Sequence, residues 1–341
     1  MTGDSHRDLN TAEFGTREQE IMKLLITGGA GFIGSNFILH MMNSHPEVDI
    51  INLDALTYAG NLNNLKVVDK NPRYTFIKGD ICDTDIVNEI LDTHKVDTIV
   101  HFAAESHVDR SITKASEFVR TNVLGTHILL ECARHHPIAK FIHISTDEVY
   151  GSTLKGSFKE KDILSPSSPY SASKAGSDLL ALSYFTTYKL PVIITRCTNN
   201  FGPYQYPEKL IPLFVTNLIA GRKVPVYGTG KNVRDWIHVS DHCRAVDFLL
   251  RKGIFGEIYN IGGGNEKTNI EITEKILMLL KKDKSLIEYV TDRPGHDFRY
   301  SLDCSKLLKM GWKPHYSFEE GLKDTVEWYM RNEWWWRPLK K

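Results

Sequence analysis

Through the first two hundred residues, short apolar runs rich in β-branched residues alternate with longer segments whose apolar positions recur with helical period. Runs of this length and composition predict strands. Because they are apolar at nearly every position, we expect both faces of the sheet to be covered by helices. The pattern predicts an α/β fold with a doubly wound parallel sheet, whose strands cover residues 23–27, 48–53, 74–78, 98–102, 141–145 and 192–196.

The alternation becomes irregular after residue 197, where glycine-rich turn clusters separate short helical patterns. We therefore expect a first domain over residues 22–200 and a smaller lobe over 201–341, some segments of which return to the first domain. Residues 1–21 are polar and mixed in charge, so we treat them as a disordered extension outside the fold. The tryptophan triplet at 334–336 is interpreted as a packed helix end, with a binding role as the alternative.

Composition limits the classes of partner. Lysine and arginine together number 42, as do aspartate and glutamate, so no net charge draws the chain to nucleic acid or an anionic membrane. No apolar run approaches the ~18 residues of a membrane-spanning helix. The five cysteines are scattered without a Cys-x-x-Cys pair, which argues against zinc and disulfides and favours a reducing cytoplasm. We expect no metal, nucleic acid or membrane as partner.

A glycine-rich turn directly follows the first predicted strand and opens a helix. Gly28, Gly31 and Gly34 stand at the spacing Gly-x-x-Gly-x-x-Gly. Glycines permit a tight turn and close approach of backbone N–H groups to a pyrophosphate, whose charge is then stabilised at the helix N-terminus. In this context the motif predicts a Rossmann-type dinucleotide site rather than a glycine-rich turn without a ligand.

Asp54 lies twenty residues after Gly34, at the end of the second predicted strand. There its carboxylate can accept hydrogen bonds from ribose hydroxyls and would repel a 2′-phosphate, which favours NAD over NADP. Further loops at the carboxyl ends of strands, at Asp80-Ile81 and Phe102-Ala103-Ala104, are expected to line the adenine and the pyrophosphate. The alternative for Asp80 is that it only caps the helix beginning near Thr84.

Tyr170 and Lys174 are four residues apart on a predicted helix, so their side chains share one face. An ammonium beside a phenol favours the phenolate, so we expect a lowered pKa for Tyr170, which would make it a base for a sugar hydroxyl. Lys174 can also reach the nicotinamide ribose. Together with the glycine motif and Ser145-Thr146 on the fifth strand, the pair resembles the short-chain dehydrogenase/reductase superfamily.

Two adjacent carboxylates, Asp147 and Glu148, come just past the fifth strand. Simple dehydrogenases and epimerases of the superfamily do not need such a pair. Removal of hydride from C4 of a hexose makes the C5 proton acidic, so one carboxylate can abstract that proton while the other protonates the departing 6-hydroxyl. The alternative is a solvated loop or helix cap.

The resemblance then becomes specific and covers nearly all of residues 22–336. Nine segments in order are similar to the signature set of the dTDP-glucose 4,6-dehydratase family, namely GGAGFIGSN, LTYAGN, HFAAESHVDRS, STDEVYG, SPYSASK, PYQYPEKLIP, VRDW, IGGGNEKTN and DRPGHD. The resemblance implies that Thr146 binds the sugar O4, Asp147 is the acid, Glu148 is the C5 base, and Tyr170 with Lys174 drive oxidation at C4.

The resemblance also implies ligand contacts. Further cofactor contacts are implied at Phe32, Ile33, Leu56, Thr57, Ser106, Thr121 and Asn200. Substrate contacts are implied at Ser106, Thr146, Asn199, Lys209, Leu210, Pro225, Tyr227, Arg234, Asn269, Arg293, His296 and Tyr300. The chemistry is suitable, because Arg234 and Lys209 can neutralise a diphosphate and Tyr227 offers an aromatic face to a base.

The family pattern further implies a homodimer through helices around residues 116–135 and 170–188. The chain departs from the pattern at Thr198, Phe201 and Phe298, which puts only details of nucleotide packing and preference in doubt.

Two other functions remain open at this point. A nucleotide-sugar 4-epimerase would share the cofactor site, Tyr170 and Lys174 but would not need Asp147 and Glu148, and its product would not lose water. A cofactor-bound scaffold without turnover would not need any of the five catalytic candidates.

Overall fold

The computed structural model describes residues 21–292 and 296–340, and the predicted extension at 1–21 lies almost entirely outside them. A seven-stranded sheet forms the first body, in the order β10-β6-β5-β4-β1-β2-β3 with every pairing parallel. Its strands are β1 (Lys23–Thr27), β2 (Asp49–Asp54), β3 (Tyr74–Lys78), β4 (Thr98–His101), β5 (Lys140–Thr146), β6 (Val192–Cys197) and β10 (Ile258–Ile261). The predicted α/β class with a doubly wound parallel sheet is confirmed, and each predicted strand begins and ends within one residue of an observed one.

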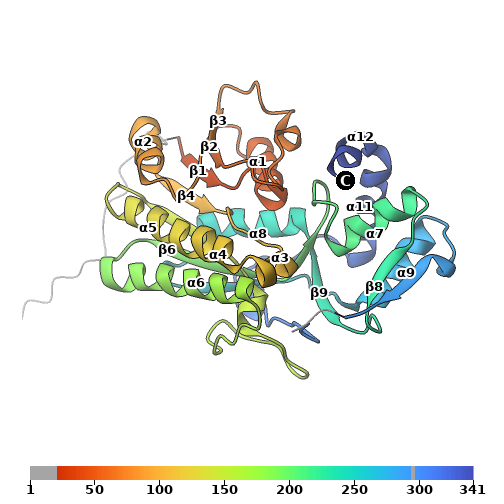
Figure 1. Cartoon of the computed structure of the whole chain (residues 1–341). Coiled ribbons are helices and arrows are strands. Elements are labelled where there is room, and N and C mark those ends of the chain that lie inside the picture. Colours follow the sequence, from red (N-terminus) through yellow and green to blue (C-terminus); the bar gives the residue numbers. More distant parts are fainter. Residues whose placement is uncertain (1–20, 293–295, 341) are drawn as a thin grey trace, which may run out of the picture.

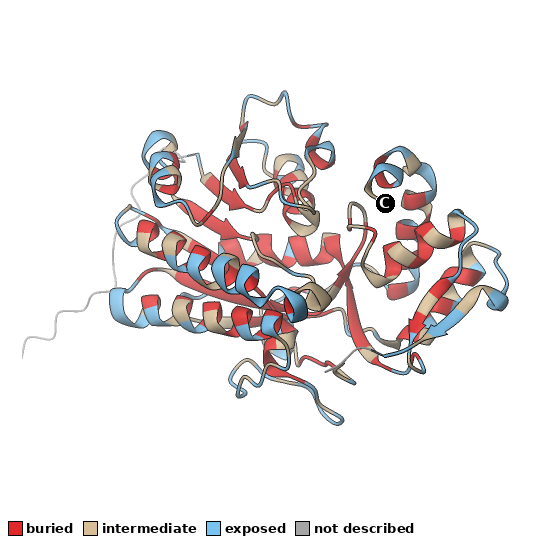
Figure 2. Cartoon of the chain, viewed as in Figure 1, coloured by how far each residue is buried: buried red, intermediate tan, exposed pale blue. Residues whose placement is uncertain are grey.

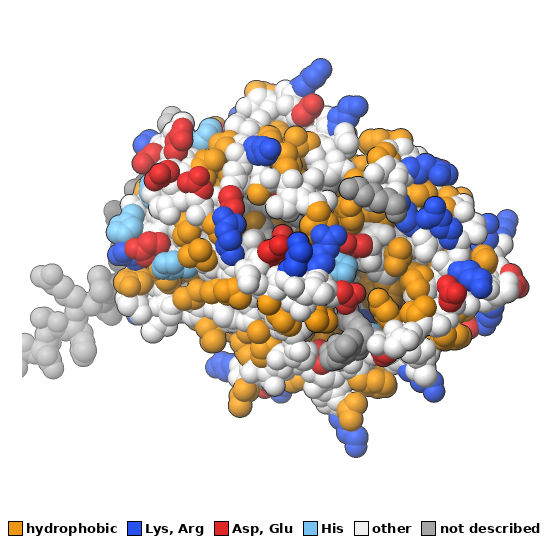
Figure 3. All heavy atoms as spheres, viewed as in Figure 1, with side chains coloured by type: hydrophobic (Ala, Val, Ile, Leu, Met, Phe, Trp, Pro, Cys, Tyr) orange, Lys and Arg blue, Asp and Glu red, His pale blue; other side chains and the backbone are white. Residues whose placement is uncertain are grey.

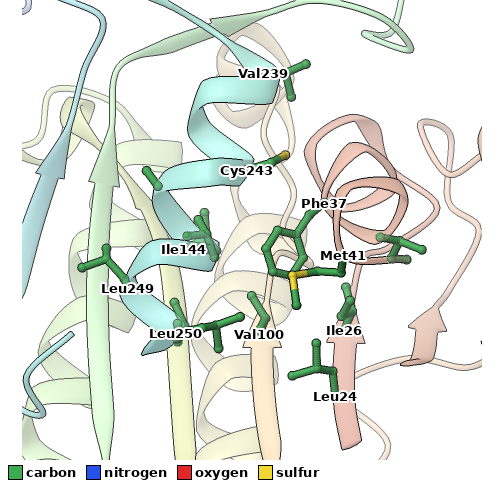
Figure 4. Close-up of a cluster of buried hydrophobic side chains, with 14 of the residues drawn as sticks. Leu24, Ile26, Phe37, Met41, Val100, Ile144, Val239, Cys243, Leu249 and Leu250 are labelled. Carbon is green, nitrogen blue, oxygen red and sulfur yellow. The ribbon is translucent and has the colours of Figure 1, made fainter. Parts of the chain in front are cut away.

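Helices cover both faces of this sheet, as its continuous apolar strands require. They are α1 (Phe32–Ser44), α2 (Thr84–His94), α3 (Val108–Thr113), α4 (Ala115–Phe118), the π-helical η2 (Val119–Gly125), α5 (Thr126–Arg134), α6 (Pro169–Tyr188), α8 (Val239–Lys252) and α10 (Ser305–Lys309). On one face, Phe37 and Met41 of α1 and Cys243 and Leu249 of α8 pack against Ile26 and its neighbours (Figure 4).

The other face of the sheet is covered by α2, α5 and α6. Leu91, Leu130 and Ala181, one from each of these helices, are buried in a cluster with Leu25 and Ile99 of the strands. The strands between the two helical layers are buried along most of their length (Figure 2). Because all seven strands run parallel, their carboxyl ends meet along a single edge, where the loops between strands and helices gather.

A smaller lobe is built mainly from residues after 197. It holds a three-stranded sheet of β7 (Asn199–Phe201), β9 (Val233–His238) and β11 (Glu266–Thr268), and a two-stranded sheet of β8 (Val224–Tyr227) and β12 (Ile287–Val290). Its helices are α7 (Leu210–Ile219), α9 (Asn269–Leu279), α11 (Phe318–Arg331) and α12 (Glu333–Trp336). They surround a separate apolar cluster that includes Phe214, Trp236, Ile272 and Trp336.

The chain passes between the two bodies more than once (Figure 1). After β7 and β9 in the smaller lobe it returns as α8 and β10, and β10 pairs with β6 at the edge of the large sheet. The smaller lobe therefore lies beside the carboxyl edge of the large sheet, and residues from both can line one site.

Among residues 21–292 and 296–340, no helix is sufficiently long and apolar to span a bilayer.

Candidate active site

A cavity of about 670 Å³ lies along the carboxyl edge of the large sheet. Loops that follow the first six strands in sequence line it, and residues 197–209, which lead into the smaller lobe, close one side. This is where doubly wound sheets bind their ligands, because the loops diverge there on either side of the central strands. The predicted residues that line it are Gly28, Gly31, Phe32, Ile33, Gly34, Asp54, Thr57, Asp80, Ile81, Phe102, Ala103, Ala104, Ser106, Thr121, Thr146, Asp147, Glu148, Tyr170, Lys174, Asn199, Asn200 and Lys209.

The glycine-rich loop has the close packing that its sequence predicts. Gly28 has a φ of +71°, and a Cβ built on it would lie 2.6 Å from the backbone of Ala103. A Cβ on Gly34 would lie 2.3 Å from the carbonyl oxygen of Gly28. Helix α1 begins immediately after Gly31 with no side-chain cap and no acidic residue in its first turn. Its first N–H groups therefore remain suited to a pyrophosphate.

Asp54 is buried at the end of β2 and faces the cavity. Its Oδ2 accepts a hydrogen bond from the Ala30 amide at 2.9 Å, and its Oδ1 accepts one from the Leu56 amide at 2.8 Å. Burial raises the pKa of this carboxyl, and the two backbone hydrogen bonds, which lower it, offset only part of that increase. The carboxylate is thus fixed beside the glycine-rich loop, where an adenosine ribose would lie. Leu56, a predicted cofactor contact, does not line the cavity.

Asp80 also lines the cavity, and the alternative that it caps helix α2 is wrong. Asp83 is the cap, since its side chain accepts hydrogen bonds from the amides of Asp85 and Ile86. Asp80 instead accepts from the Cys82 amide at 2.9 Å and pairs with Arg120 at 2.8 Å. Its carboxylate is therefore held in the loop after β3.

The five catalytic candidates meet in this cavity from three elements. Thr146 ends β5, and Asp147 and Glu148 begin the 3₁₀ turn Asp147–Tyr150 that follows it. Tyr170 and Lys174 lie on the first turns of α6, whose start is fixed by Pro169 and a capping box between Ser168 and Ser171.

Asp147 is buried, so the interpretation of this pair as a solvated loop is wrong for it. The turn is capped by Thr146, whose Oγ1 accepts a hydrogen bond from the Glu148 amide at 3.3 Å. Burial raises the pKa of Asp147 well above its usual range, and the neighbouring Glu148 raises it further. Its Oδ1 accepts from the Thr146 hydroxyl at 3.2 Å, whereas its Oδ2 has no partner among the described residues. Asp147 is therefore suited to carry a proton.

Burial and then Glu148 also raise the pKa of Tyr170 well above its usual range. The expectation that Lys174 lowers this pKa is not met in the protein alone. Lys174 is itself buried, which lowers its pKa to about 8, and its Nζ donates to the carbonyl oxygen of Ile144 at 2.8 Å. Burial and the neighbouring charges thus favour the neutral phenol.

The predicted nucleotide contacts divide into two groups. Asn199 and Lys209 line the cavity, and the Lys209 Nζ donates to the Ser106 carbonyl at 2.8 Å. The other described ones lie outside the cavity lining, in the smaller lobe or the segment packed on it, and are Leu210, Pro225, Tyr227, Arg234, Asn269, His296 and Tyr300. Arg293 lies outside the described residues.

Two of these outlying residues nevertheless lie close enough to interact electrostatically with the carboxylate pair. Arg234 acts on Asp147, and Glu148 acts on Tyr300. The Arg234 guanidinium lies 4.3 Å from the centre of the Tyr300 ring and donates to the Asp297 carbonyl at 2.9 Å. The positive charge of Arg234 lowers the pKa of Asp147, although burial outweighs it. Tyr227 and His296 form a second aromatic contact, with ring centres 6.2 Å apart.

Tyr58, Arg110 and Glu208 form a charged group on the cavity wall that the sequence pattern did not indicate. The Arg110 guanidinium lies 3.5 Å above the centre of the Tyr58 ring and pairs with Glu208 at 3.1 Å. Burial is the main cause of the raised pKa of Tyr58, and the nearby Glu208 and Glu105 carboxylates raise it further. Tyr58 and Glu208 belong to the LTYAGN and PYQYPEKLIP segments, but only the fold brings them together with Arg110.

No group of three or more His, Cys, Asp or Glu side chains that could hold a metal ion occurs within residues 21–292 and 296–340. All five cysteines are free thiols.

Comparison with known proteins agrees with this geometry. Residues 25–325 match the family model of GDP-mannose 4,6 dehydratase. The dTDP-glucose 4,6-dehydratase of Streptomyces niveus is 53% identical over 326 residues, which cover 94% of this chain and 96% of that protein.

Solved structures give the same result. DesIV, a dTDP-glucose 4,6-dehydratase from Streptomyces venezuelae crystallised with NAD and TYD bound, is 55% identical and superposes with a TM-score of 0.91, over 94% of this chain and 100% of that one. A UDP-glucose 4-epimerase from Thermotoga maritima is only 30% identical, with a TM-score of 0.86 over 92% of this chain and 100% of that one. The chain thus belongs to the GDP-mannose 4,6 dehydratase family and, within it, to the dTDP-glucose 4,6-dehydratases.

Proposed function

We propose that the chain converts dTDP-glucose to dTDP-4-keto-6-deoxy-glucose, with NAD as a tightly held and recycled cofactor. The observation that carries the proposal is the placement of Asp147 and Glu148 in one cavity with Tyr170, Lys174 and a dinucleotide-type glycine loop. The identity of 53–55% to dTDP-glucose 4,6-dehydratases supports the choice of substrate.

The residues present fit NAD. The loop from Gly28 to Gly34 and the start of α1 would hold the pyrophosphate, and Asp54 would hold the adenosine ribose. When bound, NAD accepts hydride from the hexose and returns it later in the cycle, so that no cofactor is consumed. Asp54 disfavours NADP, because its buried carboxylate would repel a 2′-phosphate.

Oxidation at C4 needs a base for the hydroxyl proton, and we assign that role to Tyr170, which lines the cavity. Thr146 would hydrogen-bond the same sugar oxygen; it lines the cavity, and its hydroxyl donates to Asp147. Lys174, buried on the same helix face, supplies a positive charge that favours the phenolate and a donor for the nicotinamide ribose.

Elimination then divides between the two carboxylates. A ketone at C4 makes the C5 proton acidic, and we assign its removal to the half-buried Glu148. The 6-hydroxyl is a poor leaving group that needs a proton, and we assign its delivery to Asp147, whose pKa is raised well above its usual range by burial. The C5–H and C6–O bonds break and a C5=C6 double bond forms, while Glu148 takes the C5 proton and the hydroxyl leaves as water with the proton from Asp147.

Substrate recognition is assigned to both bodies. Asn199 and Lys209 would bind the diphosphate at the cavity wall. Arg234, which packs on the Tyr300 ring, would bind the same diphosphate from the smaller lobe. Tyr227, near His296, would face the base of the nucleotide. An arginine is well suited to a diphosphate because its planar donors can bind two oxygens at once.

The chain is also proposed to act as a homodimer. Apolar side chains are exposed on the two adjacent helical segments η2 and α6, at Val119, Leu124, Leu179 and Tyr188. Figure 3 shows hydrophobic side chains gathered over the helices on this side of the molecule. Exposed apolar residues on neighbouring helices are typical of an interface between copies. A cytoplasmic location is proposed as well, since it would keep the five thiols reduced.

The experiment that tests the function is incubation with dTDP-glucose, UDP-glucose and GDP-mannose, followed by mass analysis. We expect a product lighter by one water from dTDP-glucose and little or none from the other two. Deuterium at C4 should migrate to C6 of the same molecule, and C5 should gain solvent deuterium. A product of unchanged mass with C4 inverted would instead support a 4-epimerase.

A further inference from the structure

The tryptophans at the C-terminal end differ sharply in burial. Trp335 and Trp336 are buried on α12, whereas Trp334 is 55% exposed. The ring of Trp335 packs edge-to-face against Trp328, with centres 5.2 Å apart, and against Tyr204 at 5.7 Å. Packing of the smaller lobe accounts for these ring contacts, but not for the hydrogen bond that the Trp335 indole makes.

That hydrogen bond leads to the cofactor loop. The Trp335 Nε1 donates to the Asn64 Oδ1 at 2.7 Å, a contact between residues 271 positions apart in the sequence. The Asn64 Nδ2 donates in turn to the Ala30 carbonyl at 3.0 Å. Ala30 lies between Gly28 and Gly31 of the glycine-rich loop, and its amide is held by Asp54. All the side chains in this relay are buried.

The relay can run in only one direction. An indole N–H can only donate and a backbone carbonyl can only accept, so Asn64 must present its oxygen to Trp335 and its nitrogen to Ala30. Without the indole donor, the Asn64 oxygen would be buried without a partner, and the amide would lose the constraint that aims its nitrogen at the loop. Trp335 therefore fixes the orientation of Asn64.

The same C-terminal segment also holds the cavity wall. The Tyr329 hydroxyl donates to the carbonyl of Gln205, and the Tyr206 hydroxyl donates to the carbonyl of Leu339 at 3.4 Å. Gln205 and Tyr206 both line the cavity. Tyr204, against which Trp335 packs, has a φ of +67°, a conformation that a non-glycine residue keeps only when its surroundings hold it.

We propose that Trp335 and Asn64 are a positioning pair that ties the smaller lobe to the cofactor loop and slows the release of NAD. Neither side chain lines the cavity, so the pair acts through the Ala30 carbonyl and the loop around it. The inference rests on the proposed function only in requiring that the glycine-rich loop binds NAD.

The test is the rate of NAD release from purified holoprotein, measured by trapping the released cofactor with an excess of a second NAD-binding enzyme. Trp335→Phe removes the donor and keeps an aromatic ring. We expect release about tenfold faster, as for an orphaned buried acceptor, and a lower NAD content on purification. Trp334→Phe is the matched control, since its indole donates to Asn332, two residues away, and it should stay within about twofold of wild type.

Asn64→Ala tests the same link from the other side and should also release NAD about tenfold faster. The double variant should release it no faster than Asn64→Ala, because residues that act through one another are not additive. Affinity for dTDP, measured by calorimetry, should stay near wild type in all variants. A general loss of structure would instead weaken dTDP binding as well.

A wild-type rate of NAD release from Trp335→Phe would overturn the inference and leave the proposed function intact. So would a double variant in which the two increases in release rate multiply. If Trp335→Phe failed to fold, a wild-type release rate in Asn64→Ala would overturn it equally. Wild-type protein that bound no NAD would refute the proposed function and the inference together.

Discussion

Replacing Asp147 by Asn separates the two halves of the proposed reaction. The change keeps the shape of the side chain and removes the proton that the 6-hydroxyl needs in order to leave. Oxidation at C4 does not use this proton. Addition of dTDP-glucose to the variant should therefore still reduce bound NAD, whereas release of water should be slow.

The structure sets the size of the effect. General acid catalysis contributes typically about 10²- to 10⁴-fold. Asp147 is only 3% exposed, so solvent water has little access to replace it. Its Oδ1 is held by Thr146, which leaves Oδ2 as the oxygen that would carry the proton in the proposed mechanism. We expect water elimination to slow by roughly 10³-fold, in the middle of that range.

Stopped-flow absorbance and product mass measure the two halves separately. In Asp147→Asn, the NADH band should appear at close to the wild-type rate and then persist, while the dehydrated product accumulates slowly. Asp162→Asn, the same chemical change at an exposed position, should behave as wild type. Loss of the NADH band together with the product, or dehydration at the wild-type rate, would refute the assignment of Asp147 as the acid.

The same substitution should not weaken the fold. Burial raises the pKa of Asp147 above its ordinary value of 3.8, so between the two pKa values the folded protein holds a proton that the unfolded chain has already released. This contribution to stability is fully present below the unfolded pKa and is lost as pH rises through the folded pKa, falling by about 1.4 kcal/mol for each pH unit between the two. Asn does not ionise, so at neutral pH the variant should melt at or above the temperature of wild type. A melting temperature several degrees lower would contradict the proposed protonation state.

Three further outcomes are expected. Tyr170→Phe should slow the appearance of the NADH band itself by at least ~10²-fold, because the base for O4 is gone, and a normal rate of reduction in stopped flow would disprove that role. Asp54→Ala should weaken NAD binding and narrow its preference over NADP, as measured by titration; wild-type protein that bound both equally would show that Asp54 does not contact the ribose. Leu179→Glu should shift the sedimentation mass from dimer to monomer, whereas Leu154→Glu, on an exposed loop, should not; a monomeric wild type would contradict the proposed interface.

Six strands of the large sheet were predictable because each is a short, mostly apolar run between helical patterns. Strand β10 was not, although it pairs with β6 in the same sheet. It spans only Ile258–Ile261 and is followed directly by three glycines, so the turn signal dominated the pattern. Its place in the sheet depends on the return of the chain through α8, a long-range connection that local periodicity does not encode.

The residues of the site were predictable where they follow strands of the large sheet, and not where they belong to the smaller lobe. Loops after successive parallel strands must meet at one edge, so the residues that follow β1 to β6 could be placed in one cavity from their order alone. The residues of the smaller lobe could not, since β8, β9 and β11 belong to two small sheets whose arrangement depends on packing around Trp236 and Ile272. The group formed by Tyr58, Arg110 and Glu208 was missed for the same reason.

The pKa of Tyr170 shows why spacing alone does not predict the state of a site. Its four-residue separation from Lys174 correctly indicates a shared helix face, but it contains no information on burial or on charges from other elements. Burial and Glu148 together outweigh the favourable contacts, so the phenol is neutral in the protein alone. The oxidised nicotinamide ring carries a positive charge that the reduced ring lacks. A positive charge in the same cavity favours the phenolate. In the proposed mechanism, bound oxidised NAD would therefore favour the phenolate of Tyr170, and reduction of the cofactor would favour the neutral phenol again.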